Sequence, residues 1–219
     1  PRTDSRYLSK DLKPSVRKAL DGLRSQKRAE IDKLDLAKLS YTRRIVNDAK
    51  VTDHHAIIPT GKSPRGLDSA AAKVFDAVLT RLIAVFYPAC VKEITTVDGV
   101  SNGVGFQAKG ARMLDPGWTA LYGGQSGGGD SQDEQELPQF KPGENGPHEP
   151  FVKKGETKPP PAFTENSLLG AMETAGKFVE EEELKEALKE KGLGTPATRS
   201  DIIETLLKRS YIERSSKTL

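Results

Sequence analysis

The chain has 219 residues, of which 35% are hydrophobic and 30% are charged, and its formal net charge is +3. This length suits one large domain or two smaller ones, and the polar composition favours a thin or multi-lobed shape over one thick core. The longest apolar run, around Val85-Phe86-Tyr87, is far too short to span a bilayer, and no signal peptide is visible. We therefore expect a soluble, cytoplasmic protein without a membrane partner.

The single cysteine, Cys90, cannot form an internal disulfide, which fits a reducing compartment. It stands in an apolar stretch, so we expect a small buried hydrophobe rather than a nucleophile. Charge is unevenly distributed: residues 1–50 are rich in Lys and Arg, whereas residues 130–136 are acidic. A basic stripe is the usual footprint of nucleic-acid binding, but charge alone favours a solvated helix face.

The first part of the chain is predicted to be helical. Ser9 is a plausible N-cap, and apolar residues then recur at helical spacing: Leu12, Val16, Leu20 and Leu23. A short second helix is expected over 34–39, and a loop over 51–62.

A longer helix and then a sheet are predicted next. Asp68 or Ser69 caps a helix with one strongly apolar face, which Pro88 ends. Residues 91–98 and 103–109 alternate in a way typical of strands, with a turn between them.

Three further features follow the predicted hairpin. Residues 112–115 form a third short segment, and residues 137–158 are expected to return as strands of the same sheet. Between them, the Gly/Ser/Asp/Glu tract at 123–136 predicts a flexible loop. Pro159-Pro160-Pro161 marks a boundary.

After this boundary the pattern is helical. Thr164 is expected to cap a helix over 167–175, and a charged amphipathic helix covers 179–191. Thr195 is the expected N-cap of the last helix, with Pro196 at its first position.

Three short motifs offer chemistry. His54 and His55 follow Asp53, and an imidazole beside a carboxylate can donate to a phosphate oxygen or move a proton near neutral pH. Adjacent histidines in an extended segment point to opposite faces, so both rarely bind one metal ion. On this motif alone, a capped loop with surface histidines is the favoured interpretation.

The second motif, Gly192–Arg199, is a tight turn that opens a helix. N–H groups, the helix dipole, two hydroxyls and an arginine converge there, which suits a phosphate, although an ordinary capped helix has the same pattern. The third motif is Pro1-Arg2-Thr3-Asp4-Ser5, in which Arg2 can clamp a phosphate bidentately. Each motif is weak or moderate alone.

Together the motifs are specific. Pro1-Arg2-Thr3-Asp4-Ser5 resembles the active-site segment of type IA DNA topoisomerases, in which the nucleophilic tyrosine directly precedes this stretch. Asp53–Thr60 is similar to the histidine motif of the topoisomerase III branch, and Gly192–Arg199 resembles the motif that opens a DNA-contacting helix. Shorter stretches such as Asp115–Trp118 and Phe163–Glu165 match in the same order, so the resemblance covers essentially the whole chain.

The resemblance implies an α+β multi-domain fold that is part of the family's toroid. Residues 1–80 would be the remainder of the helical, tyrosine-bearing domain, and residues 81–163 the β-rich arch with its flexible loop at 123–136. Residues 164–219 would be a partial helical domain that grips single-stranded DNA. The Toprim domain, which binds Mg²⁺ in the family, is expected to be absent, so no cofactor is expected within this chain.

The resemblance also implies an enzyme that relaxes or decatenates DNA. A tyrosine attacks one strand, a 5′-phosphotyrosyl link forms, a second strand passes, and the 3′-hydroxyl reseals the break. Arg2 is expected to stabilise charge at the scissile phosphate, and His54 to assist, with His55 as the neighbour to check.

Four residues are expected to contact DNA: Thr3, Ser5, Thr198 and Arg199. Thr198 matches a DNA-contacting threonine, and Arg199 is the expected phosphate partner beside it. Topoisomerase I relatives often carry an arginine where Thr195 stands, which supports the topoisomerase III branch. Tyr7 lies on the wrong side of the first motif to be the nucleophile and is expected to anchor the first helix.

The chain is expected to begin just after the tyrosine and to be inactive alone, because it lacks the nucleophile and the metal-binding acids. The expected partner is DNA, preferably single-stranded, and the expected location is the cytoplasm, at the nucleoid. An alternative is a non-catalytic remnant that still binds single strands; an upstream, in-phase Toprim domain and tyrosine would argue against it. A third hypothesis, a winged-helix-like regulator, leaves the first 60 residues unexplained.

Overall fold

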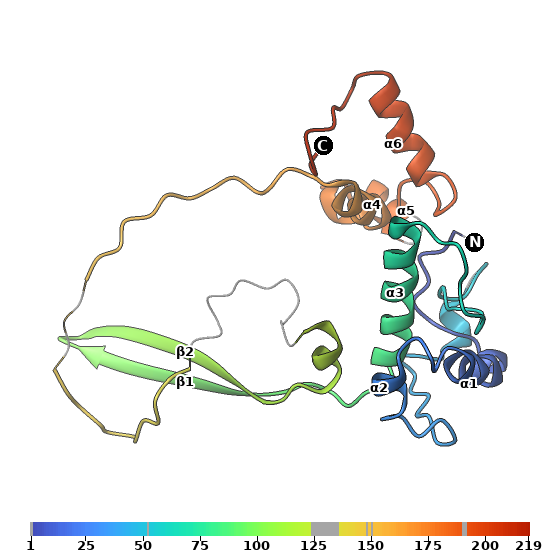
Figure 1. Cartoon of the computed structure of the whole chain (residues 1–219). Coiled ribbons are helices and arrows are strands. Elements are labelled where there is room, and N and C mark those ends of the chain that lie inside the picture. The colour runs from blue at the N-terminus through green and yellow to red at the C-terminus, as the bar shows by residue number, and fades with distance from the viewer. Residues whose placement is uncertain (1, 52, 124–135, 148, 150, 190–191) are drawn as a thin grey trace. The chain divides into compact units, whose positions relative to one another are not determined.

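A computed structural model describes residues 2–51, 53–123, 136–147, 149, 151–189 and 192–219 (Figure 1). The chain divides into two compact units. Unit 1 combines Pro1–Ser5, Thr52–Ala56 and Lys153–Leu219, and unit 2 combines Arg6–Val51 and Ile57–Val152. The mixture of helices and strands agrees with the predicted α+β class. The division into three domains at residues 80 and 163 stays a prediction.

Unit 2 begins with short helices: η1 Lys10–Leu12, α1 Lys13–Gly22, α2 Arg28–Ile31 and η2 Asp48–Lys50. The first predicted helix is confirmed by η1 and α1, and Ser9 is the N-cap of η1, although its side chain makes no capping hydrogen bond. The helix predicted over 34–39 is wrong, because these residues form turns and loop. The Asp35 carboxylate accepts the Ala37 N–H at 3.0 Å, a local bond that competes with helix formation.

Helix α3, Ser69–Ala84, confirms the predicted long helix. The Asp68 carboxylate accepts the Ala71 N–H at 2.8 Å and so satisfies a donor that the first helical turn leaves unpaired. The core of unit 2 consists of apolar side chains from α1, α2, α3 and their connections, and its largest fully buried members are Val16, Leu20, Leu23, Ile31, Leu79 and Ile83. Burial of each such side chain stabilises the fold by roughly 1.5–3 kcal/mol.

The sheet of unit 2 is an antiparallel hairpin of β1, Val91–Ser101, and β2, Val104–Asp115. Asn102 and Gly103 both have positive φ, 49° and 79°, as a tight two-residue hairpin turn requires. The predicted strand pair is confirmed, and the segment predicted separately at 112–115 belongs to β2.

The return strands predicted between 137 and 158 are wrong: the described residues of that range form no strand. Several prolines, including Pro138 and Pro142, remove the N–H groups that a strand ladder needs. Of the loop predicted at 123–136, residues 124–135 lie outside the described residues.

The base of the hairpin is anchored beside the end of α3. Helix η3, Gly117–Tyr122, follows β2, and the Trp118 N–H donates to the Pro88 carbonyl at 3.0 Å. A Cβ at Gly117 would lie under 3.0 Å from the Pro88 and Ala89 backbone oxygens, so this approach requires glycine. Cys90, at the same base, is half-buried rather than buried as predicted.

The remaining helices lie in unit 1: α4 Glu165–Glu173, η5 Ala175–Phe178, α5 Glu182–Lys189 and α6 Arg199–Lys208. Thr164 caps α4 as predicted. Its hydroxyl accepts the Ser167 N–H at 3.1 Å, and the Ser167 hydroxyl accepts the Thr164 N–H at 2.8 Å. Helix α5 begins at Glu182 rather than at the predicted residue 179, and residues 190–191 of the predicted span lie outside the described residues.

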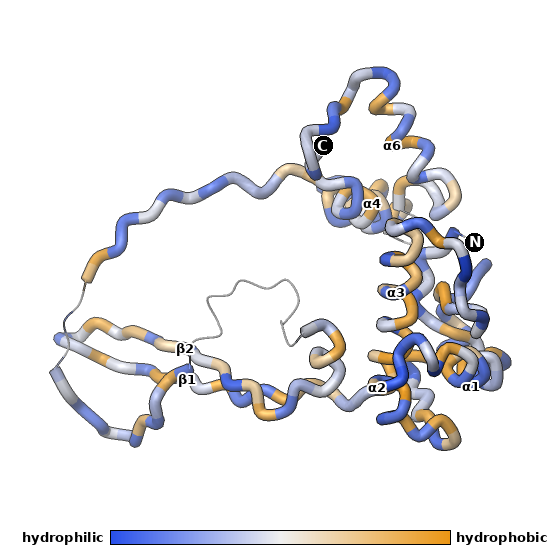
Figure 2. The backbone as a smooth tube through the Cα atoms, in the orientation of Figure 1, coloured by the Kyte–Doolittle hydropathy of each residue, from blue (hydrophilic) through white to orange (hydrophobic). Residues whose placement is uncertain are grey.

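Unit 1 buries few apolar side chains among its described residues: Met172, Ala175 and Ile203. Ion pairs supplement them, since the Arg214 guanidinium lies 2.6 Å from a Glu165 oxygen and 2.9 Å from a Glu204 oxygen. The exposed segment 153–162, which precedes α4, is mainly hydrophilic (Figure 2). No helix among the described residues is long and apolar enough to cross a membrane.

Candidate functional site

The three sequence motifs meet in unit 1. The Thr3 hydroxyl donates to the His54 carbonyl at 3.1 Å, which links positions 51 residues apart. The Arg2 guanidinium donates to the Ala197 carbonyl, across 195 positions. The structure therefore joins Arg2–Ser5, the histidine segment and the turn before α6 through direct hydrogen bonds.

The first motif is a short, irregular segment that Thr3 organises. The Thr3 hydroxyl also accepts the Ser5 N–H at 3.0 Å, a local turn that hydroxyl side chains favour. The Arg2 side chain is 59% exposed and lies 3.7 Å from an Asp201 oxygen. The Arg2 guanidinium is thus held by protein oxygens on one side and is open to solvent elsewhere. This arrangement leaves N–H groups that can bind a phosphate.

The two histidines lie in different environments. The Nδ1 atom of His55 lies 2.7 Å from the Ala56 carbonyl oxygen, and the residue is half-buried. A carbonyl only accepts, so this bond places the proton of a neutral ring on Nδ1. His54 is exposed, and its carbonyl receives the Thr3 hydroxyl. The exposed ring of His54 supports its selection over His55, and the role of each histidine stays a prediction.

Two glycines shape the turn before α6. Gly192 and Gly194 have positive φ values of 61° and 67°. A Cβ at Gly192 would lie under 3.0 Å from the backbone oxygens of Met172 and Glu173, so glycine allows the turn to pack against the end of α4. The Leu193 N–H donates to the Met172 carbonyl at 2.7 Å and holds this contact.

Helix α6 begins at Arg199, so the predicted start at Pro196 is one turn too early. The Thr195 carbonyl accepts the N–H groups of Thr198 and Arg199 at 2.9 and 3.0 Å, and the Thr198 hydroxyl accepts the Thr195 N–H at 2.9 Å. These bonds form a separate turn ahead of the helix. They also occupy three of the N–H groups expected to face a phosphate, and the Thr198 hydroxyl itself donates to the Thr195 carbonyl at 3.4 Å, so Arg2 is the better placed donor.

Arg199 is the buried arginine of the site, with a residue exposure of 6%. Its guanidinium donates to the carbonyls of Leu193 and Gly194 at 3.1 and 3.3 Å and lies 3.5 Å from an Asp4 oxygen. The sequence interpretation assigned no role to Asp4 or to Asp201. Both could have been found from the sequence, because Asp4 lies inside the motif that contains Arg2 and Asp201 lies two residues after Arg199.

The described residues contain no group of three or more His, Cys, Asp and Glu side chains that could hold a metal ion.

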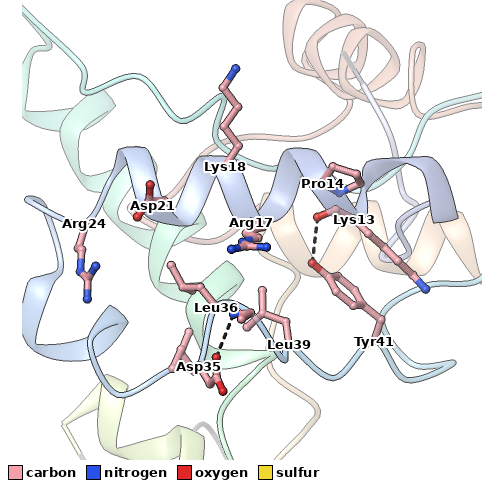
Figure 3. Close-up of a pocket in the computed structure, with 12 residues that line it drawn as sticks. Lys13, Pro14, Arg17, Lys18, Asp21, Arg24, Asp35, Leu36, Leu39 and Tyr41 are labelled. Atoms are coloured by element: carbon pink, nitrogen blue, oxygen red, sulfur yellow. Dashed lines mark hydrogen bonds between the residues drawn. The ribbon is translucent and has the colours of Figure 1, made fainter.

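A second candidate surface is a groove of about 770 Å³ in unit 2, between α1 and residues 34–41. Figure 3 shows Leu36, Leu39 and Tyr41 on the wall facing α1, while Lys18 points away from them. The Tyr41 hydroxyl donates to the Lys13 carbonyl at 3.0 Å, and burial raises the pKa of this phenol. No motif residue lines the groove, and four basic side chains do: Lys13, Arg17, Lys18 and Arg24.

Comparison with known proteins agrees with the motifs. The sequence matches the DNA topoisomerase family over residues 1–219. DNA topoisomerase 3 of Shouchella clausii is 38% identical over 231 residues, which cover 99% of this chain and 30% of that protein. The Bacillus subtilis enzyme is also 38% identical, over 100% of this chain and 31% of its own length. The Vibrio cholerae enzyme is 36% identical, over 100% of this chain and 34% of its own.

The chain thus spans about a third of the length of these relatives. The match runs through all three motifs and through both units. The resemblance predicted from the motifs is confirmed, and the chain belongs to the DNA topoisomerase family.

Proposed function

We propose that this chain is the part of a type IA, topoisomerase III-like enzyme that binds and positions single-stranded DNA. The observation that carries the proposal is the joining of three distant motifs through the Arg2–Ala197 and Thr3–His54 hydrogen bonds. Family membership supports DNA as the substrate. Side chains with hydroxyl and guanidinium groups gather where a DNA phosphate would need donors.

In this proposal Arg2 binds the scissile phosphate. Its guanidinium is exposed, permanently charged and forked, so it can donate two bonds to phosphate oxygens and stabilise the charge that develops during transfer. Thr3, Ser5 and Thr198 support the DNA strand near that phosphate. His54 assists through a phosphate oxygen, which an exposed imidazole can reach.

The whole enzyme would exchange one phosphodiester for another. A tyrosine oxygen attacks phosphorus and its proton leaves, the bond from phosphorus to the 3′-oxygen breaks, and that oxygen takes up a proton. The 5′-phosphate is then esterified to tyrosine, and the reverse step reseals the strand after passage. Neither step consumes an oxidant or a nucleoside triphosphate. Mg²⁺ would be held by the Toprim domain of the whole enzyme.

Titration with oligonucleotides tests the proposal. The chain is expected to bind a single-stranded oligonucleotide more tightly than a duplex of the same sequence, and affinity should fall as salt rises. Arg2→Gln should weaken single-strand binding about tenfold, the effect of losing one charge-assisted contact. Arg209→Gln, which removes an exposed arginine of the same unit, is the matched control.

Equal or tighter binding to duplex DNA would contradict the proposal. A plasmid relaxation assay is a second check, because the chain alone is expected to relax nothing. Cleavage of a strand by the isolated chain would overturn the assignment of the nucleophile to a tyrosine beside the Arg2 motif.

A further inference from the structure

Two arginines of the candidate site, Arg2 and Arg199, have opposite exposure. The Arg2 side chain is 59% exposed, whereas that of Arg199 is 7% exposed. A buried guanidinium is costly unless its donors are bonded and its charge is balanced. Protein carbonyls bond the donors of Arg199 and a carboxylate balances its charge. The structure of the site therefore accounts for the burial of this guanidinium.

The contacts of Arg199 fall into two groups. Nε and Nη2 donate to the carbonyls of Leu193 and Gly194, which ties the guanidinium to the turn before α6. Nη1 lies 3.5 Å from the Asp4 carboxylate, which belongs to the first motif. Arg199 therefore bridges the turn and the segment that carries Arg2.

The segment from Arg2 to Asp4 is held at both ends. Arg2 donates to Ala197 and pairs with Asp201 at 3.7 Å, and Asp4 pairs with Arg199. The backbone between them is short and irregular, so the orientation of Arg2 depends on these contacts rather than on a helix or strand. Removal of the Asp4 contact would leave the segment attached mainly through Arg2 and Thr3.

We propose that Arg199 and Asp4 are positioning residues that orient Arg2 toward the DNA, and that Arg199 is not itself a phosphate ligand. The inference rests on the proposed function, since it concerns the same DNA site. It replaces the expected role of Arg199 as a direct phosphate partner, because the guanidinium is covered and bonded to protein oxygens on two sides. Arg2 then makes the phosphate contact, and Arg199 determines the position of Arg2.

The two roles of Arg199 predict opposite results for Asp4→Asn. If Arg199 contacted phosphate, loss of the Asp4 charge would release its guanidinium and remove a repulsive carboxylate, so DNA would bind as tightly or more tightly. If the pair positions Arg2, the same substitution weakens binding although it makes the chain more basic. Asparagine has nearly the same shape as aspartate, so the change isolates the charge.

The experiment measures the Kd of a short single-stranded oligonucleotide for the chain and four variants. Asp4→Asn is expected to weaken binding about five- to tenfold, an effect no larger than the loss of one charge-assisted contact. Arg199→Lys, which cannot reproduce three divergent contacts, should weaken it similarly, and the double variant should be no weaker than either single one. Glu213→Gln removes an exposed carboxylate of unit 1 and should stay within about twofold of the unmodified chain.

Amide hydrogen exchange of Ser5 in the free protein gives a readout that needs no DNA. Its N–H is bonded to the Thr3 hydroxyl in the segment that Asp4 holds, so Asp4→Asn and Arg199→Lys should both speed its exchange. Unchanged exchange at Ser5, or Asp4→Asn binding as tight as the unmodified chain, would overturn the positioning role. Failure of the unmodified chain to bind single strands would instead overturn the proposed function.

Discussion

Units 1 and 2 are stabilised by different interactions. Unit 2 has a contiguous apolar core in which Leu20, Leu23 and Ile83 are fully buried. Unit 1 buries only a few apolar side chains among its described residues and has, beside them, polar contacts such as Arg199–Asp4 and Arg214–Glu165. The proposed DNA site lies in the unit built from polar contacts. Such contacts orient hydrogen-bond donors toward a ligand, and a single substitution can disrupt that orientation.

The largest expected effect on stability is in the core of unit 2. Leu20→Ala removes a fully buried side chain, and the cavity it leaves should lower the free energy of unfolding by about 2–5 kcal/mol. Chemical denaturation followed by circular dichroism measures this loss. Leu184→Ala in α5, where the side chain is half exposed, is the matched control and should cost far less. Equal costs at the two positions would show that burial of Leu20 does not account for the stability of unit 2.

A medium effect is expected at the capping box of α4 in unit 1. Thr164→Ala removes the hydroxyl that accepts the Ser167 N–H, so we expect a loss of about 0.5–2 kcal/mol in unfolding free energy. Thr157→Ala, in the exposed segment before α4, removes a hydroxyl without a capping role and should be nearly neutral. A neutral Thr164→Ala would show that this capping box does not stabilise unit 1.

Helix caps and tight turns could be predicted from the sequence. The cap at Asp68, the capping box at Thr164 and the hairpin turn at Asn102-Gly103 depend on neighbouring residues alone, and all three are present. The helix predicted over 34–39 failed because the Asp35 side chain closes a turn on Ala37.

The site was predictable only in part. Arg2 and His54 belong to motifs that the structure joins, as the family resemblance implied. The burial of Arg199 was not predictable, because it depends on Asp4, a partner 195 positions away, and on the shape of the turn at Gly194. Two arginines in similar polar motifs therefore looked alike in sequence and differ in the fold.

A smaller effect is expected on the stability of unit 2 as the pH is lowered. The Asp48 carboxylate accepts the Lys10 N–H at 2.8 Å, and this bond is the main cause of a pKa below the ordinary 3.8. A carboxyl with a lowered pKa in the fold stabilises it above the unfolded pKa, and this stability is lost as pH falls through the folded value. Asp48→Asn should therefore lower Tm at pH 7, and the difference should shrink below about pH 4. Thermal melts over this range measure it.

The control for this pH series is Glu136→Gln, which removes an exposed carboxylate of the same unit. Its Tm should follow that of the unmodified chain at each pH. A difference between Asp48→Asn and the unmodified chain that persists undiminished at pH 2 would show that the carboxylate charge is not responsible.

The smallest expected effect is at the groove of unit 2. Arg17→Gln combined with Lys18→Gln removes two cations from α1, and Lys18 points away from the opposite wall (Figure 3). If these two cations only belong to a solvated helix face, the affinity for single-stranded DNA should change by less than about twofold. A salt-dependence slope reduced by about 0.7 for each cation would instead show direct phosphate contacts in the groove. Comparison with Arg2→Gln at equal salt sharpens the contrast.

Hydrogen–deuterium exchange with and without a short single-stranded oligonucleotide tests directly whether the three motifs form one DNA site. If the three hydrogen-bonded motifs form one DNA site, DNA should slow exchange together in three separate peptides, 2–7, 53–57 and 193–200. The peptide 13–24, which lines the groove of unit 2, should change little. Protection confined to 13–24, or to one of the three motif peptides, would show that the three motifs do not bind DNA as one site.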